Sequence, residues 1–384
     1  MISLLIIIYL SFIMLGLPNV LGSAWPVMYG RLGVSAASAG IISMIISAAT
    51  ILGALLCDKV VRRFGASKVV LISLITTATA LIGFSMGTHF ILLCLWSIPL
   101  GIGMGLIDAS LNNVVALHYE AKHMNWLHAF WGVGASIGPI IMAFFLARAS
   151  WEAGYLSIGL IQFAFVVIFI LNFKLWKKIA PVNSLENEEQ EQKSSSLKQL
   201  IQLAGVKQSL LVIFFYCAIE ATVGLWASSY LVIARYLEEE VAALWVAIYF
   251  GGITIGRFMA GFLSSKLSHK QLIGLGSSLI GLGVAILFLP VPNSFLLISL
   301  FLIGFGCAPI FPSLMHETPN NFGTNNSQAI IGIQMAFAYV GSMFMPPLFG
   351  ILAEHTSYHL FPFYIALFLI LMIIMKRWLY QLVK

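Results

Sequence analysis

The sequence predicts an all-α integral membrane protein whose twelve transmembrane helices form two six-helix pseudo-repeats. Three observations lead to this prediction. Hydrophobic residues make up 60% of the chain and charged residues only 9%, whereas soluble domains carry about 25% charged residues. Apolar stretches of membrane-spanning length recur along the chain, and the second half repeats a residue pattern of the first. Such a chain cannot cover itself with a wetted surface, so we expect membrane lipids to surround it.

The predicted spans are apolar runs of roughly 20 residues separated by short polar turns. Because backbone polar groups in lipid must be satisfied within the segment, each run is expected to be helical. The first run continues past Pro18 and lacks the basic start of a cleaved signal peptide, so it is taken as a span. The spans are placed at 3–29, 37–57, 68–87, 90–117, 125–147, 152–173, 208–234, 241–264, 270–290, 294–316, 326–352 and 359–380.

Lysine and arginine residues fall almost entirely on one side of these spans. All but three of the 20 basic residues are assigned to one side of the membrane. Arg257 is counted with this majority. Only Arg31, Arg148 and Arg235 fall on the other. Because cytoplasmic loops are enriched in lysine and arginine, both termini are predicted to be cytoplasmic, in the plasma membrane. The net charge of +6 therefore reflects topology, and we predict no binding of nucleic acid.

One long polar segment divides the chain. Residues 175–207 contain Pro181 and a run rich in Glu, Gln and Asn, a composition typical of a linker. We predict an N-terminal six-helix bundle at 1–174, a cytoplasmic linker at 175–207 and a C-terminal bundle at 208–384. A regulatory or binding role of the linker stays open.

The two predicted bundles share matched residues in the same order. Most matches are separated by 203 residues, and one set in the fifth and eleventh spans is separated by 207. The matched pairs include Gly53 with Gly256, Gly101 with Gly304, Gly103 with Gly306, Ser110 with Ser313, Gly134 with Gly341 and Pro139 with Pro346. Two parallel six-helix repeats joined by a linker are one known plan of a secondary transporter.

The loop after the second span carries a family resemblance. It reads Gly53-Ala-Leu-Leu-Cys-Asp58-Lys59-Val-Val-Arg62-Arg63-Phe64-Gly65 and resembles the loop signature of the major facilitator superfamily. It departs in spacing, because Gly53 lies five residues before Asp58 instead of four and Gly65 comes late. The resemblance implies the major facilitator fold and a gating role for Asp58 at the cytoplasmic interface of the halves. We assign the same gating role to the basic residues Lys59, Arg62 and Arg257.

A narrower resemblance covers much of the chain. It rests on the segments Gly101 to Asn113, Asn125 to Gly134, Tyr216 to Tyr230 and Gly304 to Ser313. Together they are similar to the fucose–galactose–glucose:proton symporter branch and its sodium-coupled glucose transporter-like relatives. The resemblance implies a secondary active transporter that moves a small polar solute, above all a sugar, coupled to H+ or Na+. We expect it to act as a monomer.

Two acidic residues lie well inside predicted spans, Asp108 and Glu220. An ionisable group within a membrane bundle is costly and marks a functional site by default. Asp108 shares a helical face with Gly101, Gly105 and Asn112, and removal from water favours the protonated form of a carboxyl group. We assign Asp108, Asn112 and His128 to ion coupling. The alternative for either acid is a buried hydrogen-bond partner that only fixes two helices together.

Solute contacts are assigned to Glu220 and to three further residues. Asn19, Trp25 and Gln334 place amides or an aromatic ring in otherwise apolar helices. Amides and aromatic faces are what sugar hydroxyls and C–H groups contact, although helix–helix contacts use them as well. The sequence contains no metal-ligand cluster, phosphate loop or nucleophile–base pair, so we predict neither a metal or cofactor nor an enzymatic activity.

Two other functions compete with this hypothesis. A proton-driven exporter of drugs or amphipathic metabolites is favoured by the apolar spans and by Gly134, Gly138 and Pro139, which partly resemble an antiporter motif. The glycine pair that should follow the proline is absent, and close helix packing explains these residues equally well. A membrane sensor or lipid-handling protein without transport activity is a third alternative, and the two acids within spans make an inert sensor less favoured.

Overall fold

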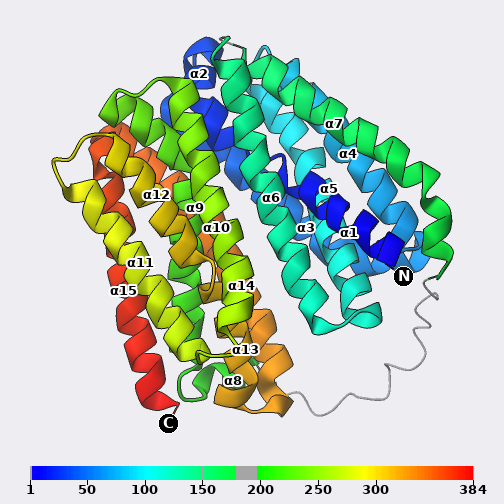
Figure 1. Ribbon diagram of the computed structural model, residues 1–384, viewed down its shortest axis with the longest axis vertical. Coiled ribbons are helices and arrows are strands. Elements are labelled where there is room, and N and C mark those ends of the chain that lie inside the picture. Colours follow the sequence, from blue (N-terminus) through cyan, green and yellow to red (C-terminus); the bar gives the residue numbers. More distant parts are fainter. Residues whose placement is uncertain (1, 149, 179–196, 384) are drawn as a thin grey trace.

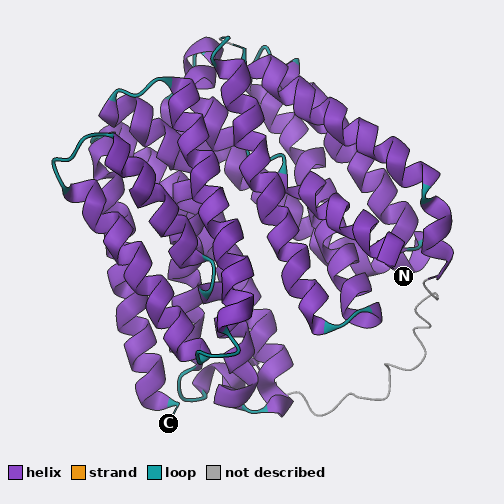
Figure 2. Ribbon diagram, viewed as in Figure 1, coloured by secondary structure: helices purple, strands orange, loops and turns teal. Residues whose placement is uncertain are grey.

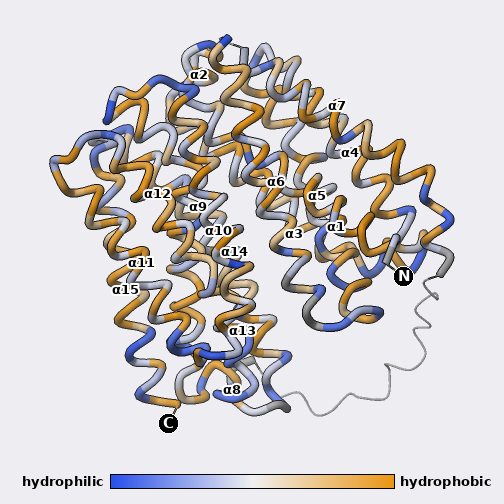
Figure 3. Tube along the Cα trace, in the orientation of Figure 1, coloured by the Kyte–Doolittle hydropathy of each residue, from blue (hydrophilic) through white to orange (hydrophobic). Residues whose placement is uncertain are grey.

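The computed structural model describes residues 2–148, 150–178 and 197–383. All secondary structure in these ranges is helical (Figure 2). They contain twelve segments long and apolar enough to cross a membrane, from Ser3–Leu32 to Tyr358–Leu382. Apolar residues predominate along many of the helices, and many hydrophilic residues lie towards the helix ends (Figure 3). The predicted fold class is confirmed.

The first half of the chain supplies α1 (Ile2–Gly16), α2 (Leu21–Leu32), η1 (Ala36–Ser38), α3 (Ala39–Phe64), α4 (Ala66–Ser85), α5 (Phe90–His118), α6 (Ala121–Leu146) and α7 (Trp151–Leu171). The second half supplies α9 (Val206–Arg235), α10 (Glu239–Leu263), α11 (His269–Phe288), α12 (Ser294–Cys307), α13 (Ile310–Phe322), α14 (Thr324–His355), η3 (Tyr358–Leu360) and α15 (Phe361–Leu382). The predicted linker overlaps η2 (Phe173–Lys178) and α8 (Leu197–Gln202). Its residues 179–196 lie outside the described residues.

Two predicted spans are each built from two helices. The first span divides into α1 and α2 around Pro18, and the tenth divides into α12 and α13 around Pro309. Proline lacks the N–H group that would continue the hydrogen-bond ladder, so both interruptions follow from the sequence. Discontinuous spans leave backbone groups free beside a central site in many transporters.

Some predicted boundaries are wrong by several residues. The helix α3 ends at Phe64 rather than at residue 57 because its polar end continues as helix beyond the apolar run. There the Arg62 guanidinium pairs with the Asp58 carboxylate at 2.9 Å, one turn away. Arg257, counted with the basic residues of the cytoplasmic side, lies inside α10 and within the predicted span 241–264.

Glycines of the repeat bring equivalent helices together in the two halves. A β-carbon on Gly101 would overlap the Ile46 carbonyl oxygen, and one on Gly304 would overlap the Tyr249 carbonyl oxygen. The second contact is the first one moved by 203 residues along the sequence. The pair Gly53–Ile102 recurs in the same way as Gly256–Phe305. The repeat found in the sequence is therefore a repeat of helix packing, in which only glycine permits the close approach of the backbones.

The two halves converge near α2 and diverge towards the end that carries both termini (Figure 1). We call the α2 end the far end and the other the linker end. At the far end, Gly22 of α2 contacts the Gly224 carbonyl oxygen of α9, and Gly40 of α3 packs on Pro347 of α14. The Ser35 hydroxyl also donates a hydrogen bond of 3.0 Å to Glu354. The far end is thus closed by close contacts between the halves.

Candidate functional site

A cavity of about 400 Å³ lies between the two halves, a volume within the usual range for small-molecule sites. Its walls come from α1, α3, α5 and α6 of the first half and from α9, α10, α11, α13 and α14 of the second. It extends towards the linker end, where the exposed Ser264 after α10 lines it. The cavity is therefore a central site between the repeats that reaches the linker end.

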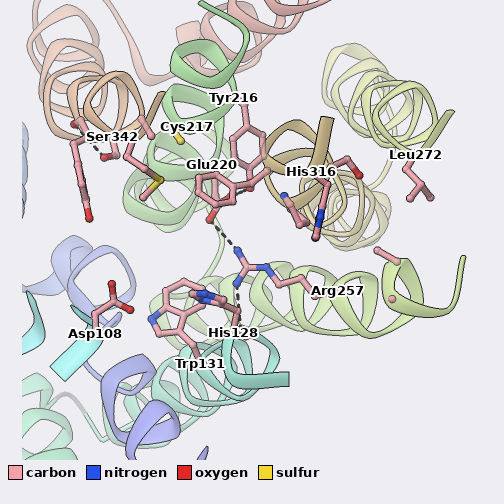
Figure 4. Close-up of a pocket in the computed structure, with 18 of the residues that line it drawn as sticks. Asp108, His128, Trp131, Tyr216, Cys217, Glu220, Arg257, Leu272, His316 and Ser342 are labelled. Atoms are coloured by element: carbon pink, nitrogen blue, oxygen red, sulfur yellow. Dashed lines mark hydrogen bonds and ion pairs between the residues drawn. The ribbon is translucent and has the colours of Figure 1, made fainter. Parts of the chain in front are cut away.

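Arg257 projects from α10 into the centre of this cavity (Figure 4). Its guanidinium lies 3.8 Å from a Glu220 carboxylate oxygen of α9. It donates a 3.3 Å hydrogen bond to the backbone carbonyl of His128 on α6. Its central carbon also lies 5.3 Å from the centre of the Trp131 ring, within the range of a cation–π contact. One side chain of the second half thereby contacts a helix of the first.

Glu220 is held on α9 by tyrosines of two helices. The Tyr216 hydroxyl, one turn earlier on the same helix, donates a hydrogen bond to its carboxylate. The Tyr249 hydroxyl of α10 donates a 3.0 Å hydrogen bond to its backbone carbonyl. The Glu220 side chain is 21% exposed, so the carboxylate remains accessible from the cavity. The sequence-based prediction that Glu220 lies deep within a span agrees with this position.

Asp108 is the acidic residue that the first half contributes to the cavity wall. The carboxylate oxygen Oδ1 accepts a 3.0 Å hydrogen bond from the Asn112 amide, one turn later on α5. Gly105, on the same face of α5, packs against the Thr50 backbone of α3. Asn112 thus fixes the Asp108 carboxylate without itself lining the cavity. Asp108 and Glu220 face one cavity from opposite halves.

His128, which the sequence assigned to ion coupling, lines the cavity. Its backbone carbonyl receives the Arg257 hydrogen bond, and its ring packs edge-on against Phe12 at 5.8 Å. Among the described residues, no hydrogen bond joins the ring to Asp108 or Asn112. The structure therefore places His128 with Arg257 rather than with the Asp108 group.

Three predicted solute contacts lie away from the cavity wall. The Asn19 amide donates to the Gly16 carbonyl at 2.8 Å, and the fully buried Trp25 donates to the Ala36 carbonyl at 2.6 Å. The Gln334 side chain, also fully buried, accepts from Thr318 and donates to Ser209. Their polar groups are used in helix contacts and turns, so the structure does not bring them together with Glu220.

The predicted gating residues divide into two groups. Asp58, Lys59 and Arg62 lie exposed at the linker end of α3. Arg257 lies in the cavity instead, beside Glu220. The structure therefore separates Arg257 from the other three.

Sequence reasoning missed several residues of the cavity wall. Arg257 was assigned to gating and not to the central site, although a basic residue inside an apolar span is as costly as an acidic one. Trp131, Tyr339 and Ser342 also line the cavity, and nothing in their sequence spacing sets them apart from packing residues. Within the described ranges, no three His, Cys, Asp or Glu residues are grouped to hold a metal ion.

Comparisons with known proteins agree with this architecture. A family model described as the Major Facilitator Superfamily matches residues 2–243 and 209–383. "Bypass of stop codon protein 6" of Saccharomyces cerevisiae is 23% identical over 294 residues, which cover 69% of this chain and only 59% of that protein. A putative glucose/galactose transporter of Helicobacter pylori is 25% identical over 288 residues, which cover 71% of this chain and 67% of that protein.

A solved structure shares the whole arrangement of helices. The crystal structure of D-xylose-proton symporter superposes with a TM-score of 0.76 at 14% identity and covers 100% of this chain and 98% of that chain. At this identity the likeness shows a common fold.

Proposed function

Because this chain belongs to the major facilitator superfamily, and is therefore a membrane transporter rather than an enzyme, we propose that it carries a small polyhydroxylated solute of the sugar class together with a proton. The observation that carries this proposal is the central cavity, which has one acidic side chain from each half, Asp108 and Glu220. A solute bound between the halves contacts both halves and links their movements.

Alternating access is supported by the contrast between the two ends. Close contacts of Gly22 and Gly40 seal the far end, whereas the cavity reaches Ser264 at the linker end. We propose that the linker end and both termini face the cytoplasm, in agreement with the distribution of basic residues. The structure then corresponds to the inward-facing state of a carrier in the plasma membrane.

Proton coupling is assigned to Asp108. A carrier that accumulates solute needs a group whose charge differs between its loaded and empty states, and a carboxyl group beside an internal cavity supplies one. The Asn112 hydrogen bond holds one oxygen of Asp108 in place. The fold neighbour described as a D-xylose-proton symporter supports a proton over Na+ as the coupling ion.

A sugar-like solute is supported by the rest of the wall. Trp131 offers an aromatic face for the C–H groups of a ring, and Ser342, Ser313 and Tyr339 line the cavity with hydroxyl groups. The Helicobacter pylori relative, named as a putative glucose/galactose transporter, is consistent with this class.

The test is solute-driven proton movement. The purified protein is reconstituted into proteoliposomes that contain a pH indicator, and hexoses, pentoses and their acid derivatives are added one at a time. We expect at least one of them to drive proton entry that protein-free liposomes lack. Solute uptake without proton movement would refute coupling, and absence of uptake for every solute would refute the assigned class.

A second candidate is export of amphipathic molecules. It is favoured by the apolar side chains in the wall, among them Met104, Phe311 and Met335, since methionine adapts to varied ligands. Thermal-shift measurements with lipophilic cations and with sugars separate the two functions, because a bound ligand stabilises the folded protein. Stabilisation by lipophilic cations alone would favour export.

A further inference from the structure

We propose that Arg257 binds a carboxylate group of the solute, so that the transported molecule is a sugar acid, and that Glu220 occupies this position in the empty carrier. This inference rests on the proposed function and narrows its substrate class from sugars in general to those that bear one carboxylate.

The guanidinium of Arg257 has unused hydrogen-bonding capacity. An arginine side chain presents five N–H donors in a planar fork. Among the described residues, Arg257 makes one hydrogen bond, to the His128 carbonyl at 3.3 Å. Its side chain is 17% exposed and lines the cavity. A partly buried cationic fork with open donors is the group that best matches a carboxylate bidentately.

The contact with Glu220 is too long to satisfy this fork. The nearest Arg257 nitrogen lies 3.8 Å from the Glu220 carboxylate, whereas charge-assisted hydrogen bonds measure about 2.7–2.9 Å. Tyr216 donates to the same carboxylate and holds it back on α9. Glu220 therefore compensates the charge of Arg257 without completing its hydrogen bonds, which leaves room for a carboxylate with better geometry.

The surroundings of Arg257 match the remainder of a sugar acid. The Trp131 ring lies against the guanidinium at 5.3 Å and lines the same cavity, where an aromatic surface can contact the C–H groups of a sugar ring. The hydroxyl group of Ser342 lines the same cavity from α14, and Asp108 lines it from α5 (Figure 4). A solute with its carboxylate on Arg257 and its hydroxyls towards Ser342 and Asp108 contacts both halves, as alternating access requires.

The test compares neutral sugars with their acids on the purified full-length protein. Binding of D-glucose and D-glucuronate, and of D-galactose and D-galacturonate, is measured by calorimetry. The variants are Arg257→Gln, Arg257→Lys and Glu220→Gln. The matched control is Arg148→Gln, which removes one positive charge from an exposed site outside the cavity wall.

We expect wild-type protein and Arg148→Gln to bind the acid of a pair roughly 10- to 100-fold more tightly than the neutral sugar, the range for a charged hydrogen bond. Arg257→Gln should abolish this preference, and Arg257→Lys should keep part of it because lysine retains the charge but not the fork. Glu220→Gln should strengthen binding of the acid about tenfold, since the competing carboxylate is gone.

Three outcomes would overturn the inference. Equal binding of both members of a pair by the wild type would do so, as would a preference that survives Arg257→Gln. Weaker binding of the acid in Glu220→Gln would also do so, and this variant decides the question if Arg257→Gln fails to fold. In each case a neutral sugar that still binds and drives proton entry would leave the proposed function standing. Failure of every sugar and every sugar acid to bind or to enter would refute both the inference and the proposed function.

Discussion

Replacing Asp108 by asparagine removes the proposed coupling group while keeping its shape. Asparagine retains an oxygen that can accept the 3.0 Å hydrogen bond from Asn112. The half-buried position on α5 is unchanged in volume. We therefore expect the stability of Asp108→Asn to stay within about 1 kcal/mol of wild type, as for a substitution that opens no cavity and leaves no buried polar group unpaired.

The expected effect on transport is large because the driving force enters through this carboxyl group. One pH unit across the membrane is worth about 1.4 kcal/mol for each proton, which is about a tenfold solute ratio. With two pH units, a carrier that moves one proton per solute should accumulate the solute about 100-fold. Asp108→Asn should reach only equal concentrations, while its solute affinity changes by no more than a few-fold.

Proteoliposomes with an imposed pH gradient provide the assay. Net uptake measures coupling, and exchange of labelled for unlabelled solute at equal pH measures the movement of the loaded carrier alone. Asp108→Asn should lose gradient-driven accumulation and keep exchange. If the variant still accumulated solute in response to the pH gradient, Asp108 would not be the coupling group and the reasoning would be wrong.

Three further predictions concern gating, topology and packing. Asp58→Asn should slow the inward–outward transition. It should leave solute affinity within a few-fold, because the Asp58–Arg62 pair is exposed and worth less than about 1 kcal/mol. Loss of solute binding in calorimetry would place Asp58 in the site. Reporter domains fused after Lys178 and after Lys384 should be cytoplasmic and one after Arg148 external, whereas an external reporter after Lys178 would reverse the topology. Gly101→Ala should destabilise the protein by about 1–3 kcal/mol, because its β-carbon would overlap the Ile46 backbone. The control Gly251→Ala, with open space around it, should be neutral or gain up to about 1 kcal/mol, and equal melting temperatures of the two variants would contradict this packing.

The fold was accessible from the sequence because its determinants are local. Length and hydropathy of each apolar run specify a spanning helix, and the matched glycines Gly101 and Gly304 specify the same helix contact in both halves. The errors lie at polar helix ends. The helix α3 continues to Phe64 because its last turns are polar. The Asp58–Arg62 pair and contact with water stabilise these turns outside the apolar run, whereas hydropathy detects only the lipid-facing part.

The site was predicted only in part. Asp108 and Glu220 were found because a carboxyl group inside an apolar span is costly wherever the helix packs. The same argument applies to Arg257 within the predicted span 241–264, but Arg257 was counted with the cytoplasmic basic residues and therefore assigned to gating. For Trp25 and Gln334, polarity alone could not reveal that the Ala36 carbonyl and the Ser209 hydroxyl already use their hydrogen-bonding groups, because such pairings depend on tertiary contacts.

The central claim, that the cavity opens alternately to the two sides of the membrane, is tested most directly by cysteine labelling at Ser342. In a background in which Cys57, Cys94, Cys217 and Cys307 are replaced, Ser342→Cys places a thiol on the cavity wall. A membrane-impermeant thiol reagent is applied to right-side-out and to inside-out vesicles, with either direction of the pH gradient. The control is Leu367→Cys on α15, where the native leucine is 51% exposed at a lipid-facing position within a spanning segment, and it should react from neither side. We predict that Ser342→Cys reacts from both sides; reaction from one side alone under every condition would contradict alternating access through this cavity.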